Sequence, residues 1–381
     1  MSNLLLNPQS GSADPSASLP ALWCYIQPAL DHIIRSPTNN LSKAPAVDIN
    51  YHMGIHTALY NYFTHRTVAA PPPPPPPSHL VKGTSAPTPP PPPRGSSTVH
   101  SQGQDVYDRL DAYLADVARE VFLGAPLDDS ALVHYLVPCF IRYSAGARSI
   151  DRLMNYLNRQ YVKRAVDEDK GWLRFGDIIS SQLAEGQAAA AAAALAPGRS
   201  GVVVVKGGDG DERGRPGCVA SHRSIAEKMH ERRVAELRRW GAPDSATAEQ
   251  LVLAEACAEA GSAPGCVLPV LSLAYRRFRT EVLEPLLALP KPKGESKGKG
   301  KKKKRKGSDS PAASAVVLAA EVDKAPRGRL ARSVKEFLES KRGDEEERTR
   351  FACEMADMLM RVGIRPEHPL RRKLGKRESI V

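Results

Sequence analysis

The 381-residue sequence lacks the short motifs that are typical of metal sites and of common catalytic centres. Its six cysteines never occur as CxxC and its ten histidines never as HExxH, which disfavours a disulfide framework and a zinc site. His52 and His56 are four residues apart on a predicted helix, a spacing that alone is weak evidence for a ligand pair. No nucleophile elbow between a strand and a helix is found, and no phosphate-binding glycine loop. We therefore expect no metal, no cofactor and no intrinsic catalysis.

Long hydrophobic runs are also missing. No apolar stretch approaches the about 20 residues that a helix needs to cross a bilayer. Residues 1–18 have neither the basic start nor the apolar centre of a signal peptide. The sequence therefore predicts a protein of the cytoplasm and nucleus, without a membrane partner and with reduced thiols.

Aromatic residues make up only 6% of the chain, and other residue types are concentrated in a few segments. Of the 33 prolines, 13 lie between Pro71 and Pro93, which predicts a polyproline II loop within residues 66–104. We favour a spacer over a ligand for SH3, WW or profilin-type domains. Residues 187–196 are nearly all alanine, inside an Ala/Gly-rich insert over residues 181–219. A core is therefore expected only in the remaining segments.

The net charge of +12 is largely local. Between Lys291 and Lys306 nine lysines and Arg305 stand against one glutamate, a net charge of +9. Such a density predicts an unfolded basic linker over residues 291–330, which would act as a nuclear import signal, as a weak phosphate binder or as a solvated spacer. The densest part of this basic run comprises Lys301, Lys302, Lys303, Lys304, Arg305 and Lys306.

Helical periodicity dominates the rest of the chain, and no run of alternating strand residues appears. The predicted helices cover residues 20–35, 47–64, 105–123, 128–144, 148–167, 171–179, 224–240, 246–260, 267–289 and 333–362. We therefore predict an all-α fold. A disordered N-terminus is expected over residues 1–19 and a helical repeat over 20–180. A helical segment follows over 220–290, and the sequence leaves open whether it forms a degenerate second repeat. A helix and a tail are expected over 331–381.

The predicted helix over residues 47–64 carries two apolar stripes. One stripe contains Ile49, Met53, His56, Tyr60 and Phe63, and the other contains Ile55, Leu59 and Tyr62. A helix with two apolar faces requires two partners. The second partner is either more core or another protein.

Two segments of the sequence resemble the cullins, the elongated scaffolds of multisubunit ubiquitin ligases. Residues 52–64, HMGIHTALYNYFT, are similar to the cullin pattern YMGxYTxxYNYCT. Residues 154–164, MNYLNRQYVKR, followed by Asp167 and Glu168, are similar to the segment YLNRxWVxRxxDE. The two segments occur in the family's order, with a variable loop after the first, and the resemblance covers about residues 22–179.

The resemblance implies a cullin-repeat-like helical bundle whose second and fifth helices bind a BTB-fold, Skp-type adaptor and, through it, F-box receptors. On this view the chain is a non-catalytic scaffold for ubiquitin-dependent protein degradation. The residues that it assigns to the adaptor contact are Met53, His56, Thr57, Tyr60, Asn61, Asn155, Asn158, Arg159 and Tyr161. For Tyr60, Leu157 and Tyr161 taken singly, a place in the core is the open alternative.

Several departures from the cullin pattern leave alternatives open. His52 and His56 stand where the family usually has tyrosines, and the carboxyl-terminal region that holds the RING subunit is not recognisable. We therefore expect no direct contact with a RING subunit. Three alternatives follow: a second chain recruits the RING subunit, the chain is a decoy that binds adaptors without delivering ubiquitin, or the sequence is a truncated gene model. The alternative function is a nucleic-acid-associated protein that uses the basic run.

Overall fold

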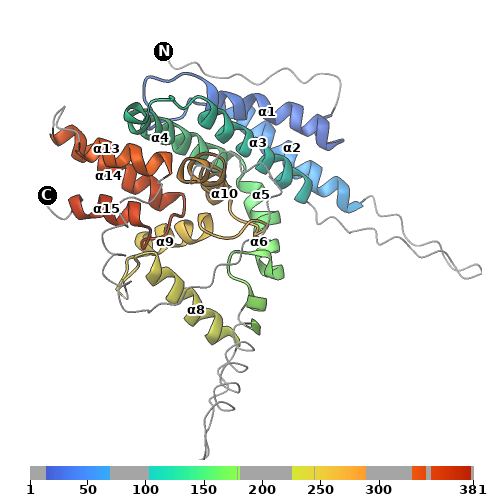
Figure 1. The fold of residues 1–381 in the computed structure, drawn as a ribbon. Helices are drawn as coiled ribbons and strands as arrows, with labels where there is room; N and C mark the ends of the chain where they lie inside the picture. Colours follow the sequence, from blue (N-terminus) through green and yellow to red (C-terminus); the bar gives the residue numbers. More distant parts are fainter. Residues whose placement is uncertain are drawn as a thin grey trace, which may run out of the picture.

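All regular secondary structure that the computed structural model describes is helical, which confirms the all-α prediction. The model describes residues 14–68, 103–177, 179–180, 225–243, 245–288, 328–339 and 345–378. The proline-rich loop, the Ala/Gly-rich insert and the basic linker lie outside these ranges except at their edges. Figure 1 shows α1 to α4 along the upper part of the molecule, α13 to α15 beside one end of α4, and α8 at the bottom.

The described helices follow the predicted patterns closely in the first half of the chain. The α-helical elements are α1 (Leu19–Arg35), α2 (Ile49–Val68), α3 (Gln104–Leu123), α4 (Asp129–Leu153), α5 (Asn155–Leu157), α6 (Lys163–Ala165), α8 (Ile225–Arg239), α9 (Ala248–Ala260), α10 (Val270–Phe278), α11 (Glu284–Leu287), α13 (Arg329–Glu339), α14 (Glu345–Arg361) and α15 (Pro369–Glu378). Three π-helical turns join some of them: η1 (Asn158–Val162), η2 (Val166–Lys170) and η3 (Arg279–Leu283).

Local signals fix where the first helices begin. The Ser18 side chain accepts a hydrogen bond from the Ala21 backbone, and Pro20 lies in the first turn of α1. The side chain of Asp128 caps α4 in the same way, because it accepts from the Ser130 backbone. These caps satisfy backbone N–H groups that the helices leave unpaired.

The path of α4 differs from the prediction, which placed a break at residues 145–147. The structure continues α4 through them to Leu153 and places the break at Met154. A Cβ at Gly146 would lie 2.9 Å from Cγ1 of Ile34, so α4 and α1 approach each other too closely there for a larger side chain. The small residues therefore serve helix packing and not a turn.

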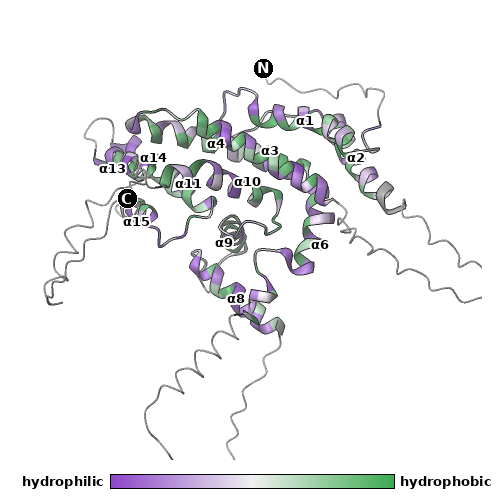
Figure 2. Cartoon of the chain, turned by 45° about the vertical axis from the view of Figure 1, so that its right-hand side comes forward, coloured by the Kyte–Doolittle hydropathy of each residue, from purple (hydrophilic) through white to green (hydrophobic). Residues whose placement is uncertain are grey.

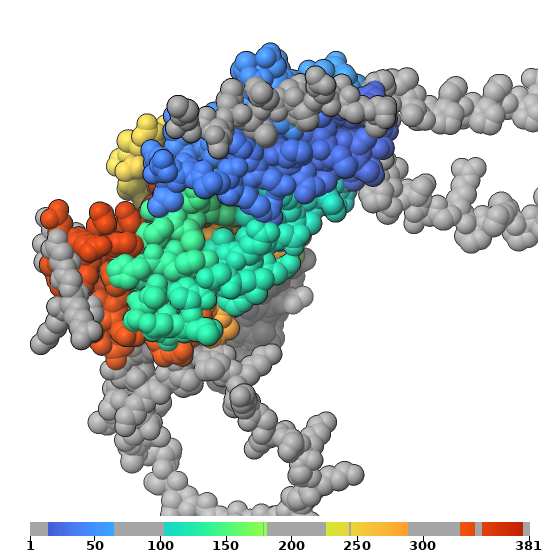
Figure 3. Space-filling model, turned by 90° about the horizontal axis from the view of Figure 1, so that it is seen from above, coloured from blue at the N-terminus to red at the C-terminus, as the bar shows by residue number. Residues whose placement is uncertain are grey.

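One continuous hydrophobic core runs from Leu22 on α1 to Leu374 on α15. The segment over residues 220–290 takes part in it, because α10 packs against α3, α4 and α9. In Figure 3 the N-terminal helices cover the upper face, and the C-terminal helices flank one end of the molecule. Where the sequence indicated one C-terminal helix and a tail, three helices are present, and α13 and α14 both pack on α4.

A second, smaller core cluster joins α8 to α9. Its buried members are Leu237, Trp240, Ala242, Ala254, Cys257 and Ala258. Figure 2 shows that α8 is hydrophilic over much of its surface. This helix therefore depends on a narrow apolar contact with α9.

Polar side chains inside the main core form hydrogen bonds with α10 and with the segment before it. The Tyr143 hydroxyl donates to the backbone oxygen of Ala274 at 3.0 Å. The hydroxyls of Ser144 and Tyr275 lie 2.8 Å apart. Because these groups are buried, their hydrogen bonds fix one register between α4 and α10.

Tyr107 on α3 provides a direct test of this polar packing. Its hydroxyl accepts from the Leu268 backbone N–H at 2.9 Å and donates to the Leu268 carbonyl at 3.1 Å. Burial raises the pKa of Tyr107 well above its ordinary range, so the hydroxyl stays protonated and able to donate.

We expect Tyr107→Phe to lower the free energy of unfolding by about 2 kcal/mol, because both backbone groups then lose their partner.

The measurement is urea unfolding followed by far-UV circular dichroism. Tyr60→Phe is the matched control, because the side chain of Tyr60 is 50% exposed, and it should change the free energy by less than about 0.5 kcal/mol. Equal values for the two variants would show that the Leu268 contact is not formed in solution.

Candidate protein-docking surface

Only one of the two apolar stripes of α2 is buried. Ile55, Leu59 and Tyr62 are at most 2% exposed and belong to the core. On the other stripe Ile49 and Met53 are 68% and 55% exposed, and Tyr60 is half exposed. The sequence left open whether this second stripe is core, and in this structure most of it faces outward.

The rotation of α2 about its axis is set near its start. The side chain of Asp48 accepts from the backbone N–H groups of Asn50 and Tyr51 at 3.0 and 3.3 Å and so caps the helix. Tyr51 is fully buried, and its hydroxyl donates to the Tyr25 carbonyl at 2.6 Å. With Tyr51 fixed inward, helical geometry places Met53, two residues later, on the outer side.

An aromatic cluster connects the exposed stripe of α2 to α5. The Tyr156 ring meets the rings of His56, Tyr60 and Phe63 edge to face, with centroid distances of 5.4, 5.9 and 5.4 Å. Tyr156 is partly buried, and burial raises the pKa of its hydroxyl. We call Ile49, Met53, His56, Tyr60 and Tyr156 the α2 surface.

The residues predicted for the adaptor contact divide by exposure. Six of the nine are exposed, whereas Asn61 and Asn158 are half-buried and Tyr161 is buried. The exposed ones are Met53, His56, Thr57, Tyr60, Asn155 and Arg159. Because Asn155 adjoins Tyr156, which contacts α2, the structure brings the two predicted helices together at one surface.

Two predicted contact residues are engaged inside the protein instead. Tyr161 is only 3% exposed, and its ring packs on Tyr107 with a centroid distance of 5.2 Å. Asn158 donates to Asp151 at 2.8 Å and accepts from the Val270 backbone at 3.0 Å, so its amide holds the start of α10. Tyr161 thus takes the core alternative that the sequence left open, whereas the half-buried place of Asn158 corrects the expectation of a surface contact.

Ile49 and Tyr156 belong to the α2 surface but were not among the predicted contact residues. The signal for Ile49 was present, because it belongs to the same helical stripe as Met53 and Tyr60. Tyr156 was harder to place, since a break at Met154 and the π-helical turn η1 alter the helical phase around it.

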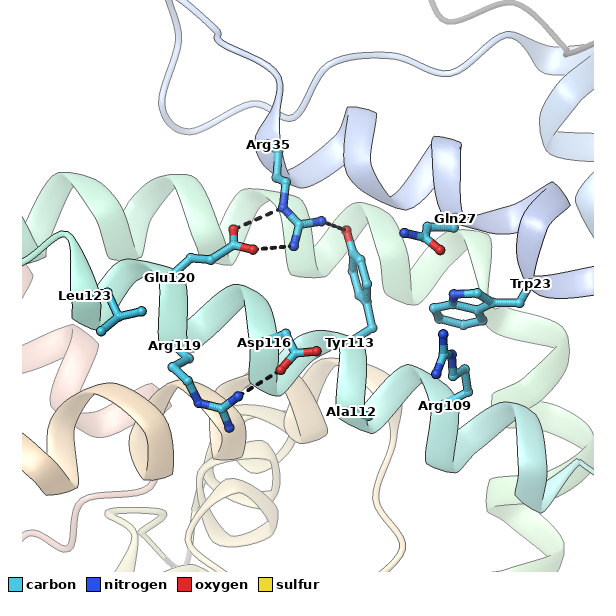
Figure 4. A pocket seen from close by; sticks show the side chains of 10 residues that line it. All are labelled: Trp23, Gln27, Arg35, Arg109, Ala112, Tyr113, Asp116, Arg119, Glu120 and Leu123. Atoms are coloured by element: carbon cyan, nitrogen blue, oxygen red, sulfur yellow. Dashed lines mark hydrogen bonds and ion pairs between the residues drawn. The ribbon is translucent and has the colours of Figure 1, made fainter. Parts of the chain in front are cut away.

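A separate hollow of about 420 Å³ lies between α1 and α3 (Figure 4). The Arg35 guanidinium donates to Glu120 at 2.7 and 3.0 Å and to the Tyr113 hydroxyl at 3.0 Å. Glu120 in turn has a lowered pKa, chiefly because of its hydrogen bonds from Arg35. Arg119 and Asp116 form a further pair at 2.9 Å. These charged side chains satisfy one another.

The last cation of this hollow, Arg109, lies over the ring of Trp23, with 5.3 Å between its guanidinium carbon and the ring centroid. A cation over an indole is a stabilising contact in its own right. The side chains that line the hollow therefore stabilise the contact between α1 and α3. Because they are already paired, they leave fewer groups for a ligand than the α2 surface does.

Metal-ligand clusters and membrane-spanning helices are both absent from the part of the chain that the structure describes. No three metal-ligating side chains gather there. None of the described helices has the length and hydrophobicity that a membrane span requires. The basic run Lys301–Lys306 falls outside the described ranges.

Comparison with known proteins gives no relative for this chain. No family model, no curated protein and no solved structure matches it. Any function of the chain is therefore inferred from its residues, its geometry and the two segments with a cullin-like pattern.

Proposed function

We propose that this chain is a non-catalytic scaffold that binds a BTB-fold, Skp-type adaptor through the α2 surface. The adaptor would bring F-box proteins to a cullin-RING-type ubiquitin ligase, in ubiquitin-dependent protein degradation. The observation that carries the proposal is the outward apolar stripe of α2, with Met53 and Tyr60 both half exposed or more. This stripe belongs to one of the two segments with a cullin-like pattern.

The composition of the α2 surface suits a protein interface. Tyrosine and methionine are enriched at the centre of such interfaces, and contiguous apolar patches are rare on monomers without a partner. Tyr60 is held by its edge-to-face contact with Tyr156, so it would lose little conformational freedom on binding. Asn155 and Arg159 are exposed nearby and supply a polar rim.

We expect the double replacement of Met53 and Tyr60 by alanine to weaken adaptor binding about 100-fold, near 3 kcal/mol, because it removes two central anchors. Binding of the purified full-length chain to a purified Skp-type adaptor is measured by titration calorimetry. The matched control is Leu123→Ala with Leu127→Ala, two exposed apolar side chains at the last residue of α3 and four residues after it. Circular dichroism checks that both variants keep their helices.

Salt dependence separates this proposal from nucleic-acid binding through the basic run. An apolar interface should keep its affinity between 0.15 and 0.5 M salt, whereas binding to phosphates falls steeply over the same range. A pull-down from native cells at both salt concentrations, with partners identified by mass spectrometry, gives the second readout. Recovery of nucleic acid alone, lost at the higher salt concentration, would move the function to Lys301–Lys306. An adaptor that binds the M53A/Y60A variant as tightly as the native chain would overturn the proposed site.

A further inference from the structure

A basic pocket lies beside the first turns of α2, where His52 lines it. The loop over residues 37–48, the first turns of α2 and the exposed edge of α4 enclose a cavity of about 370 Å³. Its polar lining consists of Ser42, Lys43, His52, Arg148, Ser149 and Arg152. We call this cavity the loop pocket.

The loop pocket itself is lined by basic side chains, while Glu249 lines the groove on the other side of Arg148. Lys43, Arg148 and Arg152 line it, and no carboxylate does. Arg148 donates only to the Ser144 hydroxyl at 3.4 Å, and Arg152 only to the Ser149 hydroxyl at 3.2 Å, among the described residues. Three like charges that converge on one cavity without an acidic partner favour an anionic ligand.

Paired arginines elsewhere in the described part of the chain show the contrast. Arg277 forms ion pairs with Asp111 and Glu281. Arg329 on α13 pairs with Asp129 at the start of α4 at 2.8 Å. Arg148 and Arg152 differ from these two arginines, because their printed hydrogen bonds go to serine hydroxyls and not to carboxylates.

The number and type of donors favour phosphate over carboxylate. A carboxylate is satisfied by one bidentate guanidinium, whereas a phosphate monoester has up to two negative charges and three acceptor oxygens. Arg148, Arg152 and Lys43, which are all exposed, supply three positive charges. The hydroxyls of Ser42 and Ser149 add two neutral donors.

A neighbouring groove indicates what carries the phosphate. Arg148 also lines a mostly apolar groove of about 400 Å³ between α9, α10 and α14. Val252 and Leu253 on α9 form part of its wall, and Val252 is 66% exposed. Because one arginine borders both cavities, a single extended ligand can place an anion on one side of Arg148 and an apolar group on the other.

From this arrangement we infer that the loop pocket binds a phosphorylated serine or threonine of a partner peptide, while an apolar residue of the same peptide occupies the groove beside Val252. This is independent of adaptor binding, because the α2 surface and the loop pocket use different side chains. The peptide would connect the α1–α2 loop to α9 across α4. Phosphorylation of the partner would then control its association with this chain.

The test uses the full-length chain and an oriented peptide library with a central phosphoserine, with binding measured by fluorescence anisotropy at constant ionic strength. We expect the phosphorylated library to bind at least about 10-fold more tightly than the same library with serine, and to select an aliphatic residue near the phosphoserine. Arg148→Gln with Arg152→Gln should reduce this affinity by about 10-fold or more, because the two charge-assisted contacts are lost. Arg365→Gln with Arg372→Gln, two exposed arginines around the start of α15, is the charge-matched control and should bind as the native chain does.

Four results would each overturn the inference. Equal binding of the phosphorylated and unmodified libraries would show that no phosphate site exists. Native affinity in the R148Q/R152Q variant, with an unchanged melting temperature, would place any site elsewhere. Inorganic phosphate that binds as tightly as the library, without a preferred flanking residue, would indicate a free anion as the ligand. Binding to vesicles that contain anionic phospholipid, but not to the peptides, would indicate a membrane surface.

Discussion

Replacement of Phe278 by alanine is expected to lower the free energy of unfolding by about 3–5 kcal/mol, the range for a large aromatic side chain removed from a packed core. Phe278 ends α10 and is fully buried. Its ring contacts Phe140 and Tyr143 on α4, each with a centroid distance of 5.1 Å. The substitution removes these contacts and leaves a cavity between the first and second halves of the chain.

Urea unfolding followed by circular dichroism and by tryptophan fluorescence measures this effect. The two probes should give the same midpoint, because the core is continuous and one cooperative transition is expected. Leu127→Ala, at a side chain that is 96% exposed, is the control and should change the free energy by less than about 0.5 kcal/mol. A loss below about 1 kcal/mol for Phe278→Ala would mean that α10 does not pack on α4 in solution.

Glu259 is expected to make the protein less stable as the pH rises from about 4.5 to about 7. This carboxyl lies between α9 and α10 and accepts a hydrogen bond from the Ser272 hydroxyl. Burial raises the pKa of Glu259 from 4.5 to about 7, with a further contribution from the charge of Glu255. In this pH range the unfolded chain gives up the proton while the folded chain retains it, so unfolding is favoured increasingly with pH.

The comparison of the native chain with Glu259→Gln isolates this effect. At 1.36 kcal/mol for each unit of pKa, the variant should gain about 3 kcal/mol over the native chain between pH 4.5 and pH 8. Glu339→Gln, an exposed glutamate near the end of α13, serves as the control. A stability difference that stays constant with pH would mean that Glu259 is not held in a buried environment.

Helix positions were largely predictable because their signals are local. The pattern over residues 20–35 agrees with α1 within one residue, and Asp128 marks the start of α4. Apolar periodicity and capping side chains act within a few residues of the backbone that they order, so one sequence contains them. The predicted break at residues 145–147 was wrong, because small residues there suit both a turn and a close helix contact, and only the packing partner distinguishes the two.

The candidate docking surface was predictable in part. Met53 and Tyr60 were found because they share a stripe on one helix, and their exposure followed from the fixed rotation of α2. Tyr161 has the same chemistry as Tyr60 and a similar place in its helical pattern, yet it is buried against Tyr107. Residue type alone therefore does not decide the environment of a tyrosine in this chain.

The sequence by itself determined that the chain is helical, where most helices begin and end, and which residues could form an apolar face on α2. The tertiary structure decided which face is covered, that α10 joins both halves in one core, and that Lys43, Arg148 and Arg152 converge on one pocket. The physical reason is the range of the forces involved. Capping and helical periodicity act along the chain within one or two turns, whereas burial and the convergence of charge depend on residues more than 100 positions apart that meet only after folding.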